Sequence, residues 1–206
     1  MSTDVQICNM ALSHIGISSI LSFTENSKAA RECSRLYAVN RDSVLEDHKW
    51  GFATKDVTLS LLANEEPLGW TYAYTYPPDC AKAREIYRGA LSSPSATADP
   101  GSVPKIDFEV RGTNDLTGRL IATNEESASL IYTGKVTSTV LFSAKFVTAL
   151  SAKLASVLAF PLRADRAIAT EWANAYVRLL LVAESKDSNE GYQKPNEQST
   201  FLGARA

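Results

Sequence analysis

Apolar residues at the start of the chain recur every three to four positions, which predicts an amphipathic helix. The positions that would share its buried face are Val5, Cys8, Leu12 and Ile15. Thr3 and Gln6 have the spacing of a capping box at its start, and Gly16 is a natural stop at its end.

A second helix is predicted after the sequence LSFTENS, where Ser22 and Glu25 repeat the capping-box spacing. It ends near Trp50 and Gly51, and a short connection to the first helix favours an antiparallel hairpin. Its inner face would contain Cys33, either Leu36 or Tyr37, Asn40 and Val44.

The period then changes to the alternation typical of strands. In WTYAYTY, four aromatic residues alternate with small ones until Pro77 and Pro78 close the strand. We expect strands around residues 57–61, 70–76, 108–110, 119–123 and 128–132, and a mobile surface loop at 89–104.

Helical spacing returns after Thr137. One helix would carry a broad apolar stripe from Val140 to Leu158, including Leu141 and Phe146, and would end at Pro161. The last helix would bury Ile168, Trp172, Ala175, Leu179 and Val182.

The order of elements predicts an α+β protein in which helices from both ends of the chain form an antiparallel bundle, residues 1–51 and 137–184. Residues 52–136 would form a central antiparallel β-sheet insertion, and residues 185–206 an extended, flexible C-terminal tail. Trp50, Gly51 and Phe52 would mark the structural corner where the bundle meets the β lobe.

Composition favours a soluble globular protein and argues against one that coats DNA, because the net charge is −2 with 21% charged residues. The three cysteines are odd in number and widely spaced, so neither a disulfide framework nor a zinc motif is predicted. Reduced, buried thiols in a protein made in a cytoplasm are expected instead. We expect no secretion signal and no membrane association, since no apolar run reaches the ~20 residues of a membrane span.

Glu46, Asp47 and His48 are the most site-like cluster, but adjacent helical residues point about 100° apart and cannot converge on one ligand. His14, the other histidine, would lie at the opposite end of the hairpin. We interpret the cluster as a helix C-terminus at which His48 and Lys49 face the negative end of the dipole.

The other candidate catalytic or ligand-binding motifs also lack required residues or geometry. YTGKVTS lacks the first glycine and the Ser or Thr of a phosphate loop. Ser143 with Lys145 and Ser151 with Lys153 are two residues apart and face different ways on a helix. Cys80 has no evident activating base. We therefore predict no catalytic, cofactor-binding or metal-binding residues.

The end of the chain is a polar segment that finishes with an apolar pair, Phe201 and Leu202, followed by Arg205. Polar linkers with such anchors can dock into a partner and order on binding. These three residues are the predicted partner-binding site; an untethered end is the open alternative.

Three stretches resemble the tail tubular protein A and head-to-tail (portal) adaptor family of tailed bacteriophages. They are ICNMALSHIGISSI, ENSKAARECSRLYAVNRDSVLEDHKWGFATKDVTL and YAYTYPPDCAKAREIY, within residues 5–87, and FLGARA is also in keeping with the family. The residues that match its packing and turn motifs are Asn9, Leu12, Gly16, Trp50, Phe52, Ala53, Pro78, Asp79 and Cys80.

The resemblance implies a non-enzymatic structural protein of the virion neck, made in the host bacterial cytoplasm. Its copies would form a homo-oligomeric, dodecameric ring that joins the portal protein to the downstream tail or nozzle protein. Genomic DNA would pass through the ring without sequence-specific binding, and no cofactor is implied. The alternatives are a cell-wall-degrading hydrolase of the phage tail, using Glu46 or Asp47, and a DNA-binding module.

Overall fold

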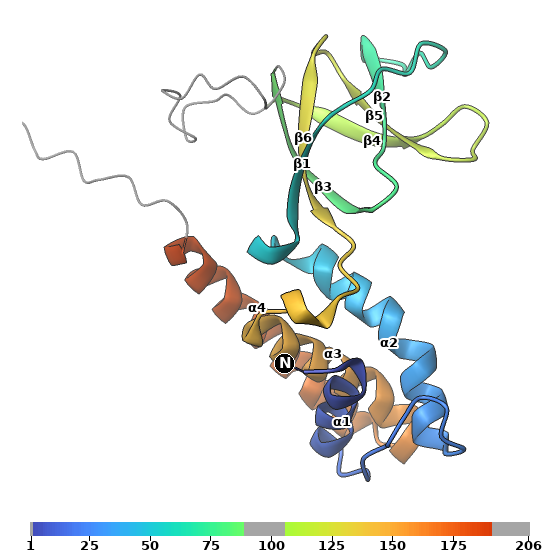
Figure 1. The fold of residues 1–206 in the computed structure, drawn as a ribbon, viewed down its shortest axis with the longest axis vertical. Helices are drawn as coiled ribbons and strands as arrows, with labels where there is room; N and C mark the ends of the chain where they lie inside the picture. The colour runs from blue at the N-terminus through green and yellow to red at the C-terminus, as the bar shows by residue number, and fades with distance from the viewer. Residues whose placement is uncertain (1, 89–105, 191–206) are drawn as a thin grey trace, which may run out of the picture.

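A computed structural model describes residues 2–88 and 106–190, which form a mixed α/β protein with four helices and two small antiparallel sheets. Figure 1 shows the helices gathered at one end of the molecule and the strands at the other. The chain crosses between these two lobes after α2 and again after β6. The coarse expectation of an α+β protein is consistent with this arrangement.

The helical lobe is built around α3 (Ala144–Arg163), which contacts α1 (Asp4–His14), α2 (Lys28–Asp47) and α4 (Arg166–Glu190). One apolar core receives side chains from all four helices, among them the fully buried Ile7, Leu12, Leu45, Phe146 and Leu154. The central position of α3 explains its broad apolar surface, because it has neighbours on three sides.

Both predicted ends of α1 are confirmed. The Thr3 hydroxyl accepts from the Gln6 amide at 3.2 Å, and the Gln6 side chain accepts from the Thr3 amide at 2.9 Å. Gly16 follows the helix with φ +67°, a conformation that costs a glycine little. The Asn9 side chain then holds the connection to α2, because it donates to the Ile20 carbonyl and accepts from the Ile20 amide.

The capping box predicted at Ser22 and Glu25 is wrong. Ser27 is the N-cap of α2 and accepts from the Ala30 amide, whereas Glu25 accepts from the backbone amide of Leu21. Residues 23–27 form turns and bends, so the N-cap lies five residues beyond Ser22. The predicted inner face is confirmed, with Tyr37 rather than Leu36 fully inside: the buried residues are Ala30, Cys33, Tyr37, Asn40, Val44 and Leu45.

α3 begins later and ends later than predicted. Ser143 is its N-cap, so Val140 and Leu141 lie in the separate 3-10 turn η2 (Thr139–Leu141) and are exposed. Pro161 lies inside the last turn of the helix instead of ending it, and the helix continues to Arg163. The helix ends where Ala164 adopts a left-handed conformation, φ 55°.

α4 begins directly after Asp165, whose carboxylate accepts hydrogen bonds from the backbone amides of Ala167 and Ile168. Its buried contacts centre on Tyr176 and Ala183; Ile168, Trp172 and Leu179 pack against the core, but Val182 is half exposed. The helix continues to Glu190, so residues 185–190, assigned to the tail from the sequence, are helical.

In the described part of the chain, α3 alone is long and apolar enough to cross a membrane by length and composition. Half of its most apolar 18-residue segment is buried inside the protein.

The β lobe contains two three-stranded antiparallel sheets where the sequence predicted one. The strand orders are β1 (Thr54–Thr58), β6 (Ala128–Gly134), β3 (Cys80–Arg88) and β2 (Tyr72–Thr75), β5 (Arg119–Thr123), β4 (Phe108–Gly112). The two sheets share a core that contains Tyr74, Tyr76, Ile86, Ile121 and Leu130. The predicted loop 89–104 lies outside the described residues.

One strand was missed and one expected face is confirmed only in part. The longest of the described strands, β3, was not predicted, because CAKAREIYR mixes charged and apolar residues without clear alternation. Of the four alternating aromatic residues, Tyr72, Tyr74 and Tyr76 pack in the core between the sheets, whereas Trp70 precedes β2 and packs beside Ala73 in a separate cluster.

Candidate interaction surface and lobe junction

The cluster Glu46-Asp47-His48 does not form a site. The carboxylate of Asp47 accepts a 2.6 Å hydrogen bond from the Tyr176 hydroxyl of α4. The His48 ring is buried and packs edgewise on Trp50, with 4.7 Å between ring centroids. Glu46 is exposed at the end of α2. Three neighbouring side chains therefore take three different directions: helical geometry separates Glu46 from Asp47, and His48 follows the helix with extended backbone.

The expectation that His48 and Lys49 balance the helix dipole is wrong, because Arg84 of β3 occupies that position. Its guanidinium Nη2 donates to the carbonyls of Leu45, Glu46 and His48 at 3.2, 3.0 and 2.7 Å. These are carbonyls that a helix C-terminus leaves without an internal partner.

The path of β3 explains how Arg84 reaches the helix. The pairing with β6 shifts register between Ala83 and Glu85, so Arg84 is the extra residue of a β-bulge, which bends a strand and re-aims a side chain. Its Nε donates to Thr133 Oγ1 at 2.8 Å, which fixes the guanidinium plane. Burial lowers the pKa of Arg84 from its ordinary value. One arginine thus fastens the β lobe to the end of α2.

Trp50, in the predicted corner, forms the other half of this junction. Its side chain is 1% exposed, and its indole Nε1 donates to the Val44 carbonyl at 2.8 Å. The ring meets Phe146 of α3 edge to face, at 5.1 Å between centroids, and Phe52 packs on the same phenylalanine at 5.2 Å. A Cβ added at Gly51 would meet no atom within 4 Å, so close packing does not require glycine there.

The motif residues Asp79 and Cys80 also have structural roles. The Asp79 carboxylate accepts from Lys55 at 2.6 Å and from the Tyr132 hydroxyl at 3.0 Å, and these bonds lower its pKa. It therefore ties the turn before β3 to β1 and β6. The Cys80 thiol is buried, and burial raises its pKa, which does not favour a nucleophile.

Ser151 and His14 form a serine–histidine contact that invites a catalytic interpretation. Ser151 Oγ lies 3.4 Å from His14 Nε2, but it also donates to the Thr148 carbonyl at 2.9 Å. The side chain of Ser151 is 0% exposed, so no substrate reaches it. Among the described residues, no group of three His, Cys, Asp or Glu side chains is placed to hold a metal ion.

His14 lies instead at the centre of a hollowed surface. Its ring stacks on Trp172 of α4 at 3.9 Å, and the Trp172 indole donates to the His14 carbonyl at 3.2 Å. Burial lowers the pKa of His14. The stack leaves His14 at the border between two hollows, one along α1 and one between α1, α3 and α4.

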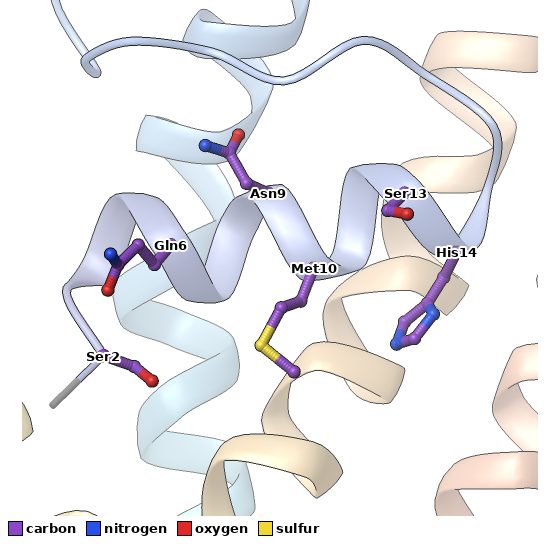
Figure 2. A pocket seen from close by; sticks show the side chains of 6 residues that line it. All are labelled: Ser2, Gln6, Asn9, Met10, Ser13 and His14. Carbon is purple, nitrogen blue, oxygen red and sulfur yellow. The ribbon is translucent and has the colours of Figure 1, made fainter.

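The hollow along α1, of about 520 Å³, is shown in Figure 2, where Met10 and His14 extend from the same side of the helix. The second hollow, of about 410 Å³, is lined mainly by apolar atoms of Trp172, Leu179 and Val182 together with His14 and Thr148. A third, of about 340 Å³, contains Met10, Val140, Val147 and Thr148. Their shared lining residues join the three hollows into one surface.

We call this surface the apolar face and define it by Met10, His14, Val140, Val147, Thr148 and Val182. Met10, Val140 and Val182 are 37%, 59% and 50% exposed. Sequence reasoning missed it because it placed Val140 and Val182 in buried stripes. The signal for Met10 was available: it is an apolar residue of α1 outside the stripe Val5, Cys8, Leu12 and Ile15.

The predicted partner-binding residues Phe201, Leu202 and Arg205 lie outside the described residues. No family model matches this chain, and no curated protein gives a significant match to it.

Proposed function

We propose that this chain is a structural protein of a tailed-phage virion, a head-to-tail adaptor of the tail tubular protein A kind. Copies associate into a dodecameric ring that joins the portal protein to the downstream tail protein and surrounds the path of the genomic DNA. In this proposal the four helices are an antiparallel bundle, the strands are its insertion, and residues 191–206 are the extended portal-docking tail.

The observation that carries the proposal is the apolar face. It spans α1, η2, α3 and α4 and exposes large apolar side chains around three adjoining hollows. Connected apolar surface of this kind is typical of protein–protein contacts. We assign it to the side-to-side contact between neighbouring copies, because a ring needs a large apolar surface on every subunit.

The lobe junction supports a mechanical role. The Arg84 contacts and the buried Trp50 connect the two lobes through several hydrogen bonds and a packed aromatic cluster. A subunit that must join two different partners at its two ends benefits from such a rigid connection. Of the two carboxylates named for the hydrolase alternative, Asp47 accepts a hydrogen bond from Tyr176, whereas Glu46 is exposed at the end of α2.

Electron microscopy of the protein mixed with its portal tests the proposal, with Val140→Asp as the disrupting variant. We expect an added ring below the portal with the native protein and loss of that ring with Val140→Asp, since a carboxylate in an apolar contact stays unpaired. Val39→Asp is the matched control: Val39 is also an exposed valine, 69% against 59% for Val140, but it lies on α2 away from the hollows.

Failure of the folded native protein to add a ring overturns the adaptor function. A ring that forms with Val140→Asp as readily as with Val39→Asp overturns the assignment of the apolar face. If the native protein lyses cell-wall material and Glu46→Ala does not, the hydrolase alternative is favoured instead.

A further inference from the structure

Two leucines of the β lobe are almost fully exposed. Leu68, in the segment before β2, is 89% exposed, and Leu116, in the turn between β4 and β5, is 86% exposed. Figure 1 shows both segments in the β lobe, away from the helices. Single exposed leucines are common on protein surfaces, whereas two on adjoining segments form a small apolar patch.

The backbone of Leu116 is strained as well as exposed. Its φ of 57° lies in the left-handed region, where the Cβ of a leucine comes too close to the following carbonyl oxygen. Turns normally place glycine or asparagine at such a position, because both tolerate it at a lower cost. Since the side chain is exposed, packing within the chain does not offset the strain. A strained residue that its own fold does not use points to a function outside the chain.

The turn that carries Leu116 is held by its own hydrogen bonds. The Asp115 carboxylate accepts from Thr113 Oγ1 at 2.5 Å, and from the backbone amide and the hydroxyl of Thr117 at 3.1 and 2.7 Å. The Gly118 amide donates to Thr113 Oγ1 at 3.0 Å. These bonds fix the turn before a partner binds, which lowers the entropy that binding costs.

The same turn is tied to the segment that carries Leu68. The Asn114 amide donates to both carboxylate oxygens of Glu65 at 3.2 Å, and Arg111 Nη1 donates to the Leu68 carbonyl at 2.9 Å. The two exposed leucines therefore belong to one braced part of the β lobe. We call its two joined segments, residues 65–68 and 113–118, the leucine tip.

The charges of the leucine tip are acidic. Glu66 and Asp115 are exposed, whereas the nearby Arg111 is paired with Glu109 at 2.6 Å. Hydrogen bonds from the two flanking threonines hold the pKa of Asp115 at about 2, so this carboxylate is charged at neutral pH and in mild acid. Anionic lipids would repel such a tip, whereas a basic protein surface would attract it.

We propose that the leucine tip docks into an apolar pocket, bordered by lysine or arginine side chains, on the downstream tail protein. The inference rests on the proposed adaptor function, which requires a second partner besides the portal. Leu68 and Leu116 enter the apolar pocket, and the carboxylates of Glu66 and Asp115 face its basic border. An apolar centre within a polar, charge-complementary rim is the usual anatomy of a protein–protein contact.

Binding of the purified downstream tail protein to the isolated adaptor, without portal, tests the inference separately from ring formation. Leu116→Asn is the informative variant, because asparagine tolerates the left-handed backbone. We expect this variant to melt about 2–4 °C higher than the native protein, since it relieves strain. We also expect it to bind the tail protein at least about tenfold more weakly in Kd, because it loses an apolar anchor.

Leu21→Asn is the matched control. Leu21 is 91% exposed, but it lies between α1 and α2 in the helical lobe, so its substitution should leave binding to the tail protein unchanged. Leu68→Asn should reproduce the loss of binding. Glu66→Gln should slow association, and the effect should be largest at low salt, where charges are least screened.

Equal affinity of Leu116→Asn and Leu21→Asn, or no binding by the native protein, overturns the inference. A lower melting temperature of Leu116→Asn also overturns it, because the fold would then use this leucine. Binding to vesicles of phosphatidylethanolamine and phosphatidylglycerol that Leu116→Asn abolishes assigns the tip to a membrane and overturns the tail-protein contact. Binding of the tail protein that depends on Leu116, without an added ring on the portal, supports the tip and contradicts the ring.

Discussion

At the scale of single residues, polar groups that resemble catalytic machinery are used to hold the fold. Tyr176 donates to Asp47, and Asn9 bonds both backbone groups of Ile20, so each polar side chain replaces water that folding removed. Trp50 combines the largest fully buried side chain with a satisfied indole N–H. Its size and its hydrogen bond make it the residue on which the corner between the lobes depends most.

Trp50→Ala should reduce the free energy of unfolding by about 3–5 kcal/mol, because it leaves a large cavity beside Phe146 and a carbonyl of Val44 without its donor. Denaturant unfolding followed by circular dichroism measures the loss. His48→Ala is the comparison: His48 is buried against the edge of Trp50, so we expect a smaller but measurable loss, on the order of 1 kcal/mol. Equal stability of Trp50→Ala and the native protein would contradict this account of the corner.

At the scale of elements, the sequence predicted the buried residues best where one face of an element is buried and the other is exposed to solvent. The periodicity of α1 and α2 identified residues on the buried face of each helix, although it missed Ile7 and Ala11 of α1. β3 was not predicted because Lys82, Arg84 and Glu85 interrupt the alternation of apolar and polar residues. Two register shifts also break its period of two. Arg84, one of the charged residues that obscure the strand pattern, is also the residue that connects the two lobes.

Arg84→Met should destabilise the protein by on the order of 1–3 kcal/mol, because the carbonyls at the end of α2 lose a charged donor. Arg88→Met on the same strand is the matched control. The Arg88 side chain is 78% exposed and pairs with Glu125, and exposed pairs of this kind contribute little to stability.

Unfolding of the two lobes, followed separately by tryptophan spectroscopy, shows whether Arg84 couples the lobes or stabilises only its own surroundings. Trp70 reports on the β lobe and Trp172 on the helical lobe, and their unfolding transitions should coincide in the native protein. In Arg84→Met we expect the two transitions to move apart. Coincident transitions with unchanged midpoints would show that Arg84 does not couple the lobes.

At the scale of the whole molecule, the helical lobe, which carries the apolar face, lies at one end and the β lobe at the other (Figure 1). The apolar face depends on α1, η2, α3 and α4, which are brought together from residues 4–14 and 139–190. A surface assembled from such distant segments has no continuous signal in the sequence. The proposed portal contact through Phe201, Leu202 and Arg205 follows from the sequence alone.

Deletion of residues 193–206 should weaken attachment to the portal by at least about tenfold in Kd, roughly the contribution of one apolar anchor, while leaving the thermal midpoint of the isolated protein unchanged. Binding of purified portal to immobilised protein provides the measurement. Phe201→Ala combined with Leu202→Ala should reproduce the loss, and Ser199→Ala combined with Thr200→Ala should not. A truncated protein that binds as tightly as the full chain would refute the docking role of the tail.

The sequence by itself determined the ends of α1, the buried faces of the first two helices, the order of helices around a β segment, and the absence of any convergent helical site at Glu46–His48. These are local properties, set by side-chain periodicity and backbone capping within a few residues. Only the tertiary structure decided the division of the strands into two sheets, the approach of Arg84 to α2 and the apolar face. Each of these joins residues far apart in the chain, and such contacts follow from packing in three dimensions, which local periodicity does not encode.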